Sequence, residues 1–181
     1  NPNHLHTLED LLQLYEGPEF LALNKIYRST YEIISYAKQI KHTAAEAIER
    51  HCATPTITCC QDNAEAIKAV AAGINTFIRS NDTSLGIIVK TNRAAQELYA
   101  ALSEDYDIHL LTPESTHFES GITVTSISLS KGLEFDEVII PYADAATYHT
   151  EYDRSLLYVA CTRAMHRLSL FYSGKKSPLL P

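Results

Sequence analysis

Strands and helices are expected to alternate along this chain. Short segments with strand-like apolar runs alternate with longer segments in which apolar residues recur at helical spacing. Short apolar or β-branched runs predict strands at 20–23, 56–60, 85–89, 108–111, 122–127, 137–140 and 168–172. Helical spacing predicts helices that begin after Ser29, Asp62 and Thr91, and a last helix over about 153–164. This alternation predicts an α/β fold with a mostly parallel sheet flanked by helices.

Polar residues mark where the first helices should begin. Ser29-x-x-Glu32 and Asp62-x-x-Glu65 have the spacing of capping boxes, and Thr91 can cap the helix that follows it. The run at 85–89 is almost uninterrupted by polar residues, which is typical of a strand covered on both faces. Residues 1–19 are expected to form a lead-in helical segment, and residues 20–181 a single domain.

Composition and charge narrow the classes of function. A chain of 181 residues with 45% apolar residues can bury a full core, and its net charge of −7 excludes a generally basic nucleic-acid coat. A nucleic-acid contact would therefore be a local strip. No apolar run is long enough for a bilayer crossing, so we expect no membrane partner and a cytoplasmic location. The four cysteines and eight histidines lack ligand spacing, and we expect no metal site among them.

Open parallel sheets bind ligands beyond the carboxyl ends of their strands, and three polar segments stand out, two just after predicted strands and one in the last helix. They cover residues 27–30, 130–136 and 158–164. Each has an ordinary explanation when taken alone. Arg28 can point to water at a helix start, Lys131 and Gly132 can form a turn, and Arg163 is favoured near a helix end by the helix dipole.

Taken together and in this order, the three segments resemble motifs IV, V and VI of superfamily 1 helicases of the UvrD/Rep/PcrA kind. Residues 23–30, LNKIYRST, are similar to the family's N-Y-R-S, and residues 130–136, SKGLEFD, to its A-K-G-L-E-F. Residues 157–164, LYVACTRA, are similar to Y-V-A-x-T-R-A. The resemblance extends over nearly the whole chain and implies domain 2A, the second RecA-like motor domain.

The resemblance also implies roles for individual residues. Arg28 and Arg163 would be arginine fingers that neutralise charge on the γ-phosphate of ATP. Tyr27 would stack on the adenine, Lys131 with Gly132 would meet the phosphates, and Glu134 would accept from the ribose hydroxyls. Single-stranded DNA would contact a strip formed by Lys90, Asn92, Thr125, Ser126 and Ser128.

A phosphate-binding loop is missing from the chain. The only Gly-Lys pair, Gly174-Lys175, lacks the glycine and the hydroxyl residue that a Walker A loop requires. The P-loop and the Mg²⁺-binding acid are therefore expected in a motor domain 1A that precedes residue 1 in a longer protein. The chain alone is expected to be inactive.

Departures from the family pattern leave the exact role open. Ser126 and Ser128 stand where the family has the Thr and His of T-x-H-x-x-K-G, which is closer to the helicase IV and HelD-like branch. Only a short loop lies between about 111 and 122, where UvrD carries its inserted 2B domain. The first hypothesis is an ATP-dependent DNA helicase or translocase of DNA repair, and the second a HelD-like ATPase that remodels RNA polymerase. A third, a purely structural domain, has no need for Arg28, Lys131, Glu134 and Arg163 together.

Overall fold

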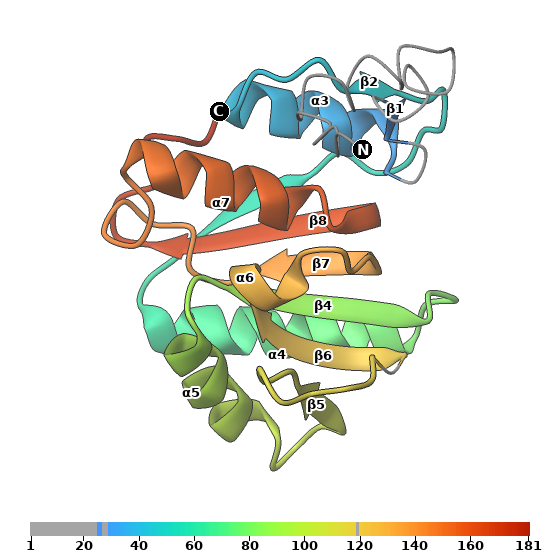
Figure 1. Cartoon of the computed structure of the whole chain (residues 1–181). Coiled ribbons are helices and arrows are strands. Elements are labelled where there is room, and N and C mark those ends of the chain that lie inside the picture. The colour runs from blue at the N-terminus through green and yellow to red at the C-terminus, as the bar shows by residue number, and fades with distance from the viewer. Residues whose placement is uncertain (1–24, 27–28, 119) are drawn as a thin grey trace, which may run out of the picture.

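The sheet at the centre of the structure has six strands, all parallel, in the order β3-β8-β7-β4-β6-β5 (Figure 1). The structure is a computed structural model that describes residues 25–26, 29–118 and 120–181. The strands are β3 Thr56–Cys60, β4 Ser84–Val89, β5 Ile108–Leu110, β6 Gly121–Ser126, β7 Phe135–Ile140 and β8 Ala164–Ser173. The predicted α/β fold with a parallel sheet is confirmed. The expected strand at 20–23 and the lead-in segment 1–19 lie outside the described residues.

Helices cover both faces of this sheet. They are α3 Tyr31–Ile40, α4 Asn63–Ile78, α5 Asn92–Leu102, α6 Ile127–Ser130 and α7 Glu151–Cys161. One apolar cluster joins α3, α6 and α7 to the sheet, and a second joins α4 and α5 to its other face. The central strand β4 is buried at every position, as its apolar run predicts. A separate parallel pair, β1 Lys25–Ile26 with β2 Glu46–Ala47, lies beside α3 (Figure 1).

Two of the predicted helix starts are confirmed in detail. Asp62 Oδ1 accepts from the Glu65 amide at 2.8 Å, and the Glu65 carboxylate accepts from the amide of Gln61. Thr91 Oγ1 accepts from the Ala94 amide at 3.1 Å. These bonds satisfy amides that a helix leaves without partners in its first turn.

The capping box predicted at Ser29 is wrong. The helix begins after Thr30, whose side chain forms no capping bond, and Ser29 Oγ donates instead to the Ala164 carbonyl at 2.6 Å. Glu32 is also used elsewhere, because its carboxylate meets His51 Nδ1 at 2.7 Å and the Cys52 amide at 3.1 Å. Tertiary contacts therefore take both side chains that the local pattern had assigned to the cap.

Two boundaries near the end of the chain also differ from the prediction. The last helix begins at Glu151, behind a capping box made by Thr150 and Asp153, and ends at Cys161. Strand β8 starts already at Ala164, so Arg163 stands between helix and strand rather than inside the helix. Among the helices that the structure describes, none combines the length and apolar character needed to cross a membrane.

Candidate nucleotide and nucleic-acid surfaces

The predicted site residues lie at two opposite edges of the sheet. Because all six strands are parallel, their amino ends share one edge and their carboxyl ends share the other. Glu134 and Arg163 stand directly before β7 and β8, hence at the amino edge, whereas Lys90 and Asn92 follow β4 at the carboxyl edge. The sequence predicted Glu134 in the segment after the strand at 122–127 and Arg163 in the last helix, and both lie at the amino edge. The fold provides two separate surfaces.

Backbone hydrogen bonds at the amino edge join segments that are far apart in sequence. The Thr30 amide donates to the Met165 carbonyl at 3.1 Å, and the Phe135 amide donates to the Arg163 carbonyl at 2.9 Å. With the bond from Ser29 Oγ to Ala164, they hold the starts of α3, β7 and β8 together. The segments that resemble motifs IV, V and VI thus meet along one edge.

Arg163 is half-buried and is bound to its own domain. Its Nη1 donates to the Leu133 carbonyl at 3.1 Å, its Nε to the Val159 carbonyl at 3.2 Å and its Nη2 to Thr162 Oγ1 at 3.4 Å. Burial lowers the pKa of the guanidinium, while the nearby Glu134 carboxylate opposes this shift. A guanidinium has five N–H donors, so these three bonds leave capacity for an anionic ligand.

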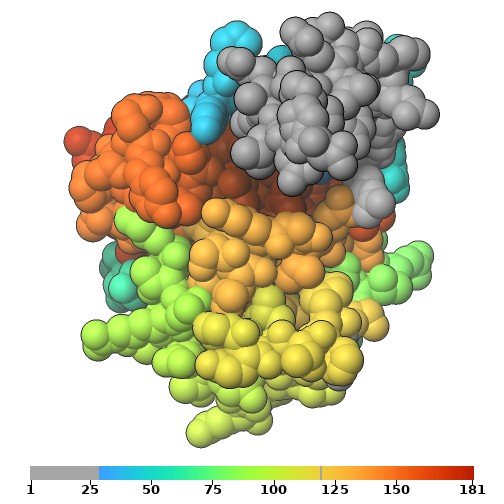
Figure 2. All heavy atoms as spheres, in the orientation of Figure 1, coloured from blue at the N-terminus to red at the C-terminus, as the bar shows by residue number. Residues whose placement is uncertain are grey.

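The segment before β7 presents Lys131 to solvent. Lys131 and Gly132 are exposed just after α6, and Glu134 is half-buried beside Phe135. Gly132 has a φ of +82°, a left-handed conformation in which glycine is strongly favoured over residues with a Cβ. Figure 2 shows α6 and the segment after it, in light orange, near the centre of one face. Tyr27 and Arg28 precede Ser29 and lie outside the described residues.

At the carboxyl edge, burial separates the predicted nucleic-acid residues. Thr125 and Ser126 are fully buried, and Thr125 Oγ1 donates to the Ser126 carbonyl at 3.0 Å. Ser126 Oγ lies 3.2 Å from Ser128 Oγ and accepts from the Leu129 amide at 3.4 Å. Of these three hydroxyls, the one exposed to solvent is that of Ser128. Asn92, the first residue of α5, is also exposed.

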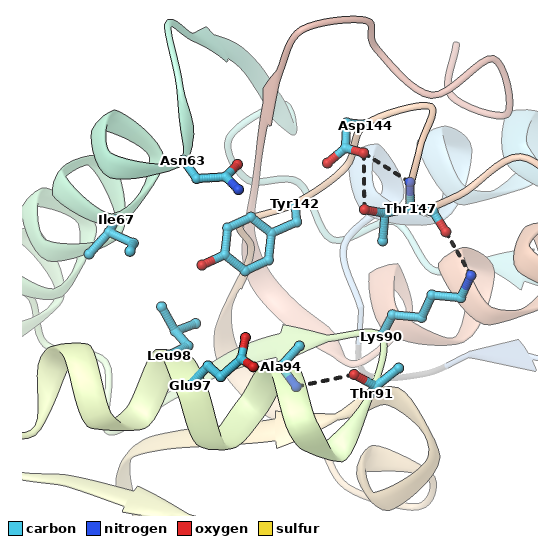
Figure 3. A pocket seen from close by; sticks show the side chains of 10 residues that line it. All are labelled: Asn63, Ile67, Lys90, Thr91, Ala94, Glu97, Leu98, Tyr142, Asp144 and Thr147. Carbon is cyan, nitrogen blue, oxygen red and sulfur yellow. Dashed lines mark hydrogen bonds between the residues drawn. The ribbon is translucent and has the colours of Figure 1, made fainter.

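Lys90 is engaged inside the domain. Its ammonium lies 2.8 Å from Asp153 Oδ1, donates to the Thr147 carbonyl at 2.7 Å and stands 5.7 Å from the Tyr148 ring centroid. It borders a pocket of about 430 Å³ that is also lined by Tyr142 and Glu97 (Figure 3). The structure therefore gives Lys90 a role in holding the carboxyl edge together.

Sequence reasoning missed a group of residues at the amino edge. Asp82, Asp136 and His166 place their polar atoms within 4.8 Å of one another, and Glu137 lies against them on β7. Burial first, and then the neighbouring Asp82 carboxyl group, raise the pKa of Glu137 to about 7. Burial of Asp136 is outweighed by hydrogen bonds from Thr83, which hold the pKa of its carboxyl below the ordinary value. Asp82 and His166 are 84 positions apart, so no local motif could have signalled this group.

Comparison with known proteins agrees with this architecture. The family model described as UvrD-like helicase C-terminal domain matches residues 121–171. The C-terminal domain of a possible DNA helicase from Lactobacillus plantarum WCFS1 is similar in structure, with a TM-score of 0.73 and 32% identity over 85% of this chain and 91% of that chain. None of the curated proteins matches the sequence significantly.

Two more distant structures share less of their length with this chain. The helicase nonstructural protein 10 of an arterivirus, in complex with DNA, has 14% identity and a TM-score of 0.44, over 68% of this chain and 31% of that chain. Dbp5 of Saccharomyces cerevisiae, bound to RNA and ADP with beryllium fluoride, has 17% identity and a TM-score of 0.47, over 81% and 43%. The identity and coverage of the Lactobacillus domain, together with the family match, assign the chain. It belongs to the family of UvrD-like helicase C-terminal domains.

Proposed function

We propose that this chain is the second motor domain, 2A, of an ATP-dependent superfamily 1 DNA helicase or translocase. The observation that carries the proposal is the meeting of three distant segments at the amino edge, where Ser29 binds Ala164 and Phe135 binds Arg163. These segments carry the residues whose chemistry suits a nucleotide, because cationic N–H donors neutralise phosphates and a carboxylate accepts from ribose hydroxyls.

Arg163 and Arg28 act as arginine fingers in this proposal. Phosphoryl transfer depends on positioning and on neutralising charge, and an arginine from a second domain adds roughly 10³ to 10⁵ in rate. The half-buried guanidinium of Arg163 is held by Leu133 and Val159 in the present state. Closure against domain 1A would exchange part of these bonds for phosphate oxygens, and hydrolysis would return them.

The remaining nucleotide contacts come from Lys131, Gly132, Glu134 and Tyr27. The P-loop and the Mg²⁺ ligands would be supplied by domain 1A of the same protein. The left-handed Gly132 keeps the backbone free of a side chain beside the exposed Lys131. A phosphate could therefore approach this turn closely.

The carboxyl edge is the surface that we propose for single-stranded DNA. Ser128 and Asn92 are exposed there, and both side chains can donate to phosphate oxygens. This surface would be stabilised from inside the domain by Thr125, Ser126 and Lys90, because the two hydroxyls are buried and the ammonium is paired with Asp153. DNA and nucleotide would then bind opposite ends of the same strands.

The test uses the full protein that contains this domain together with its partner motor domain. We expect single-stranded DNA to stimulate ATP hydrolysis and the protein to displace a DNA strand, with Arg163→Ala abolishing both. Arg79→Ala, an exposed arginine at the end of α4, is the matched control and should retain both activities. ATP hydrolysis that responds to RNA polymerase and not to DNA, without strand displacement, would overturn the helicase proposal in favour of polymerase remodelling.

A further inference from the structure

Three carboxylates and one imidazole converge at the amino edge of the sheet. Asp82 comes from the loop before β4, Asp136 and Glu137 from β7, and His166 from β8. His166 Nδ1 lies 3.0 Å from Asp82 Oδ1 and 3.8 Å from Asp136 Oδ1. The four residues form what we call the acid–histidine cluster.

The spacing of these atoms suits a small cation. Bonds of about 2.0 to 2.2 Å to nitrogen and oxygen place neighbouring ligand atoms roughly 3.0 to 3.4 Å apart. The ligand atoms of Asp82, Asp136 and His166 all lie within 4.8 Å of one another, so modest side-chain rotation brings them into that range. A pocket of about 260 Å³, lined by Asp82, His166, Arg50 and Arg167, adjoins the cluster and offers a path of entry.

Glu137 supplies an independent observation. Its side chain is 4% exposed, and its Oε1 has no hydrogen-bond partner in the described part of the chain. Asp82 lies within hydrogen-bonding reach of the same carboxyl group. Ionised carboxylates only accept hydrogen bonds, so the buried Glu137 and the half-buried Asp82 repel each other unless a proton or a cation lies between them, and the charge of nearby Arg167 only partly offsets this repulsion.

The backbone is irregular at the same point. Phe135 pairs with Ala164 and Glu137 with Arg167, so two residues of β8 stand opposite the single residue Asp136. Such bulges redirect side chains and occur next to functional sites. Here the irregularity includes His166 and lets it reach the carboxylates of β7 and of the loop before β4.

We propose that Asp82, Asp136, Glu137 and His166 form a binding site for one divalent cation of the manganese or zinc class. Imidazole favours Zn²⁺ and related transition metals, and carboxylates favour harder ions such as Mn²⁺. Mg²⁺ fits this set poorly, because it keeps several waters and prefers oxygen ligands. The site joins β4, β7 and β8 at the edge that carries Arg163, and it does not depend on the proposed helicase function.

Arg50 competes with the cation for His166. Its Nη2 lies 2.6 Å from His166 Nε2, and because a guanidinium only donates, this nitrogen accepts and Nδ1 carries the proton toward Asp82. A cation at Nδ1 displaces that proton to Nε2, so Arg50 must turn away. Arg50 is exposed and can do so. Any proton shared by Glu137 and Asp82 leaves to solvent when the ion binds.

Calorimetric titration of the chelator-treated chain with ZnCl₂, MnCl₂ and MgCl₂ in turn tests the proposal. We expect one Zn²⁺ or Mn²⁺ per chain and much weaker binding of Mg²⁺. His166→Gln and Glu137→Gln should each weaken binding about tenfold or more. Arg50→Ala should bind at least as tightly as the unaltered chain, because the competing donor is gone. His42→Gln, which alters an exposed histidine outside the cluster, is the matched control and should bind normally.

A second measurement does not depend on the variants being folded. In the unaltered chain, addition of Zn²⁺ should shift the ¹⁵N resonance of His166 Nδ1 and move its proton to Nε2. Binding that survives both His166→Gln and Glu137→Gln, or an imidazole that does not respond to either ion, would overturn the proposal. A proton shared between Glu137 and Asp82, with no ion bound, would then be the explanation of the cluster.

Discussion

Arg163 is held in place by hydrogen bonds within its own domain. Its bonds to oxygen atoms of Leu133, Val159 and Thr162 keep a cation half-buried at the amino edge, near the Glu134 carboxylate. In the proposed function, this cation would meet the negative charge that develops on a transferring phosphoryl group.

We therefore expect Arg163→Ala and Arg28→Ala, each in the full protein, to lower kcat by about 10³ while nucleotide affinity stays within about tenfold. Arg163→Lys should also lose most of the activity, because an ammonium cannot replace the planar guanidinium. Steady-state hydrolysis and nucleotide binding should be measured on the same preparations. Wild-type turnover in both alanine variants would show that the arginine assignments are wrong.

Ser128 has a smaller expected role at the other edge. Its hydroxyl lies 3.2 Å from Ser126 Oγ and is too short to reach from DNA to a phosphate at the amino edge. Ser128→Ala should weaken single-strand binding by about 1 kcal/mol or less, while hydrolysis at saturating DNA remains. Hydrolysis measured against DNA concentration decides this, since loss of stimulation at saturation would make Ser128 the coupling residue.

Asp153 should make stability depend on pH. Burial of this carboxyl is outweighed by Lys90 and by the amides of His149 and Thr150, which hold its pKa well below the ordinary value. A carboxyl group whose pKa is lower in the folded state than in the unfolded state stabilises the fold at pH values above its unfolded-state pKa, ~3.9. This stabilisation is lost as the pH falls toward the folded-state pKa.

Asp153→Asn should therefore lower the free energy of unfolding at pH 7 by roughly 3 kcal/mol. The difference from the unaltered chain should begin to shrink below about pH 4. Urea unfolding of both proteins at neutral and acidic pH measures it. An equal difference at the two pH values would contradict the assigned cause.

Between elements, β4 and β7 approach closely at Gly86. A Cβ added to Gly86 would lie 2.6 Å from the ring of Phe135, which is itself fully buried. The absence of a side chain at Gly86 thus allows the phenylalanine of the segment resembling motif V to pack under the sheet. The packing of β4 and β7 is thus connected with the amino edge through this ring.

Gly86→Ala should lower the free energy of unfolding by about 1 to 3 kcal/mol, because neither the ring nor the backbone can move far. Gly73→Ala is the matched control in helix α4. Its added Cβ would meet the flexible Cδ1 of Ile139 at 2.7 Å, and alanine gains about 1 kcal/mol in helix propensity. Chemical unfolding should separate the two, and an equal loss in both would contradict the packing argument.

On the scale of the whole molecule, we propose that this domain supplies part of a catalytic site that a second domain completes. No phosphate-cradling loop occurs in the sequence, and the amino edge offers cations and a carboxylate without the loop that would bind the β- and γ-phosphates. Catalysis would then depend on closure against a second motor domain.

The chain of 181 residues alone should show no measurable ATP hydrolysis. A phosphate-release assay with and without single-stranded DNA measures it, with Arg163→Ala as the comparison. Hydrolysis that this substitution abolishes would overturn the view that the domain supplies only half of the site.

Repeating patterns along the chain determined much of the secondary structure of this protein. Apolar spacing predicted helices α4 and α5 and the buried strand β4. A helix with one buried face shows apolar residues at helical spacing, and a strand buried on both faces shows a continuous apolar run, so both patterns are visible in the local sequence. Three short motifs were enough to suggest the family. Asp62 and Thr91 cap their helices as predicted, because capping involves only neighbouring residues.

Tertiary structure alone decided which edge of the sheet each residue occupies. The order β3-β8-β7-β4-β6-β5 brings His166 to Asp82, and the packing of α3 against β8 brings Ser29 to Ala164. No periodicity along the chain predicts these neighbours. Tertiary structure also buried Ser126 while leaving Ser128 exposed, since a short helix turns the chain between them. Local sequence patterns indicate which face of a helix or strand is buried. Sites form where the ends of separate strands lie side by side, and this arrangement depends on how the whole chain packs.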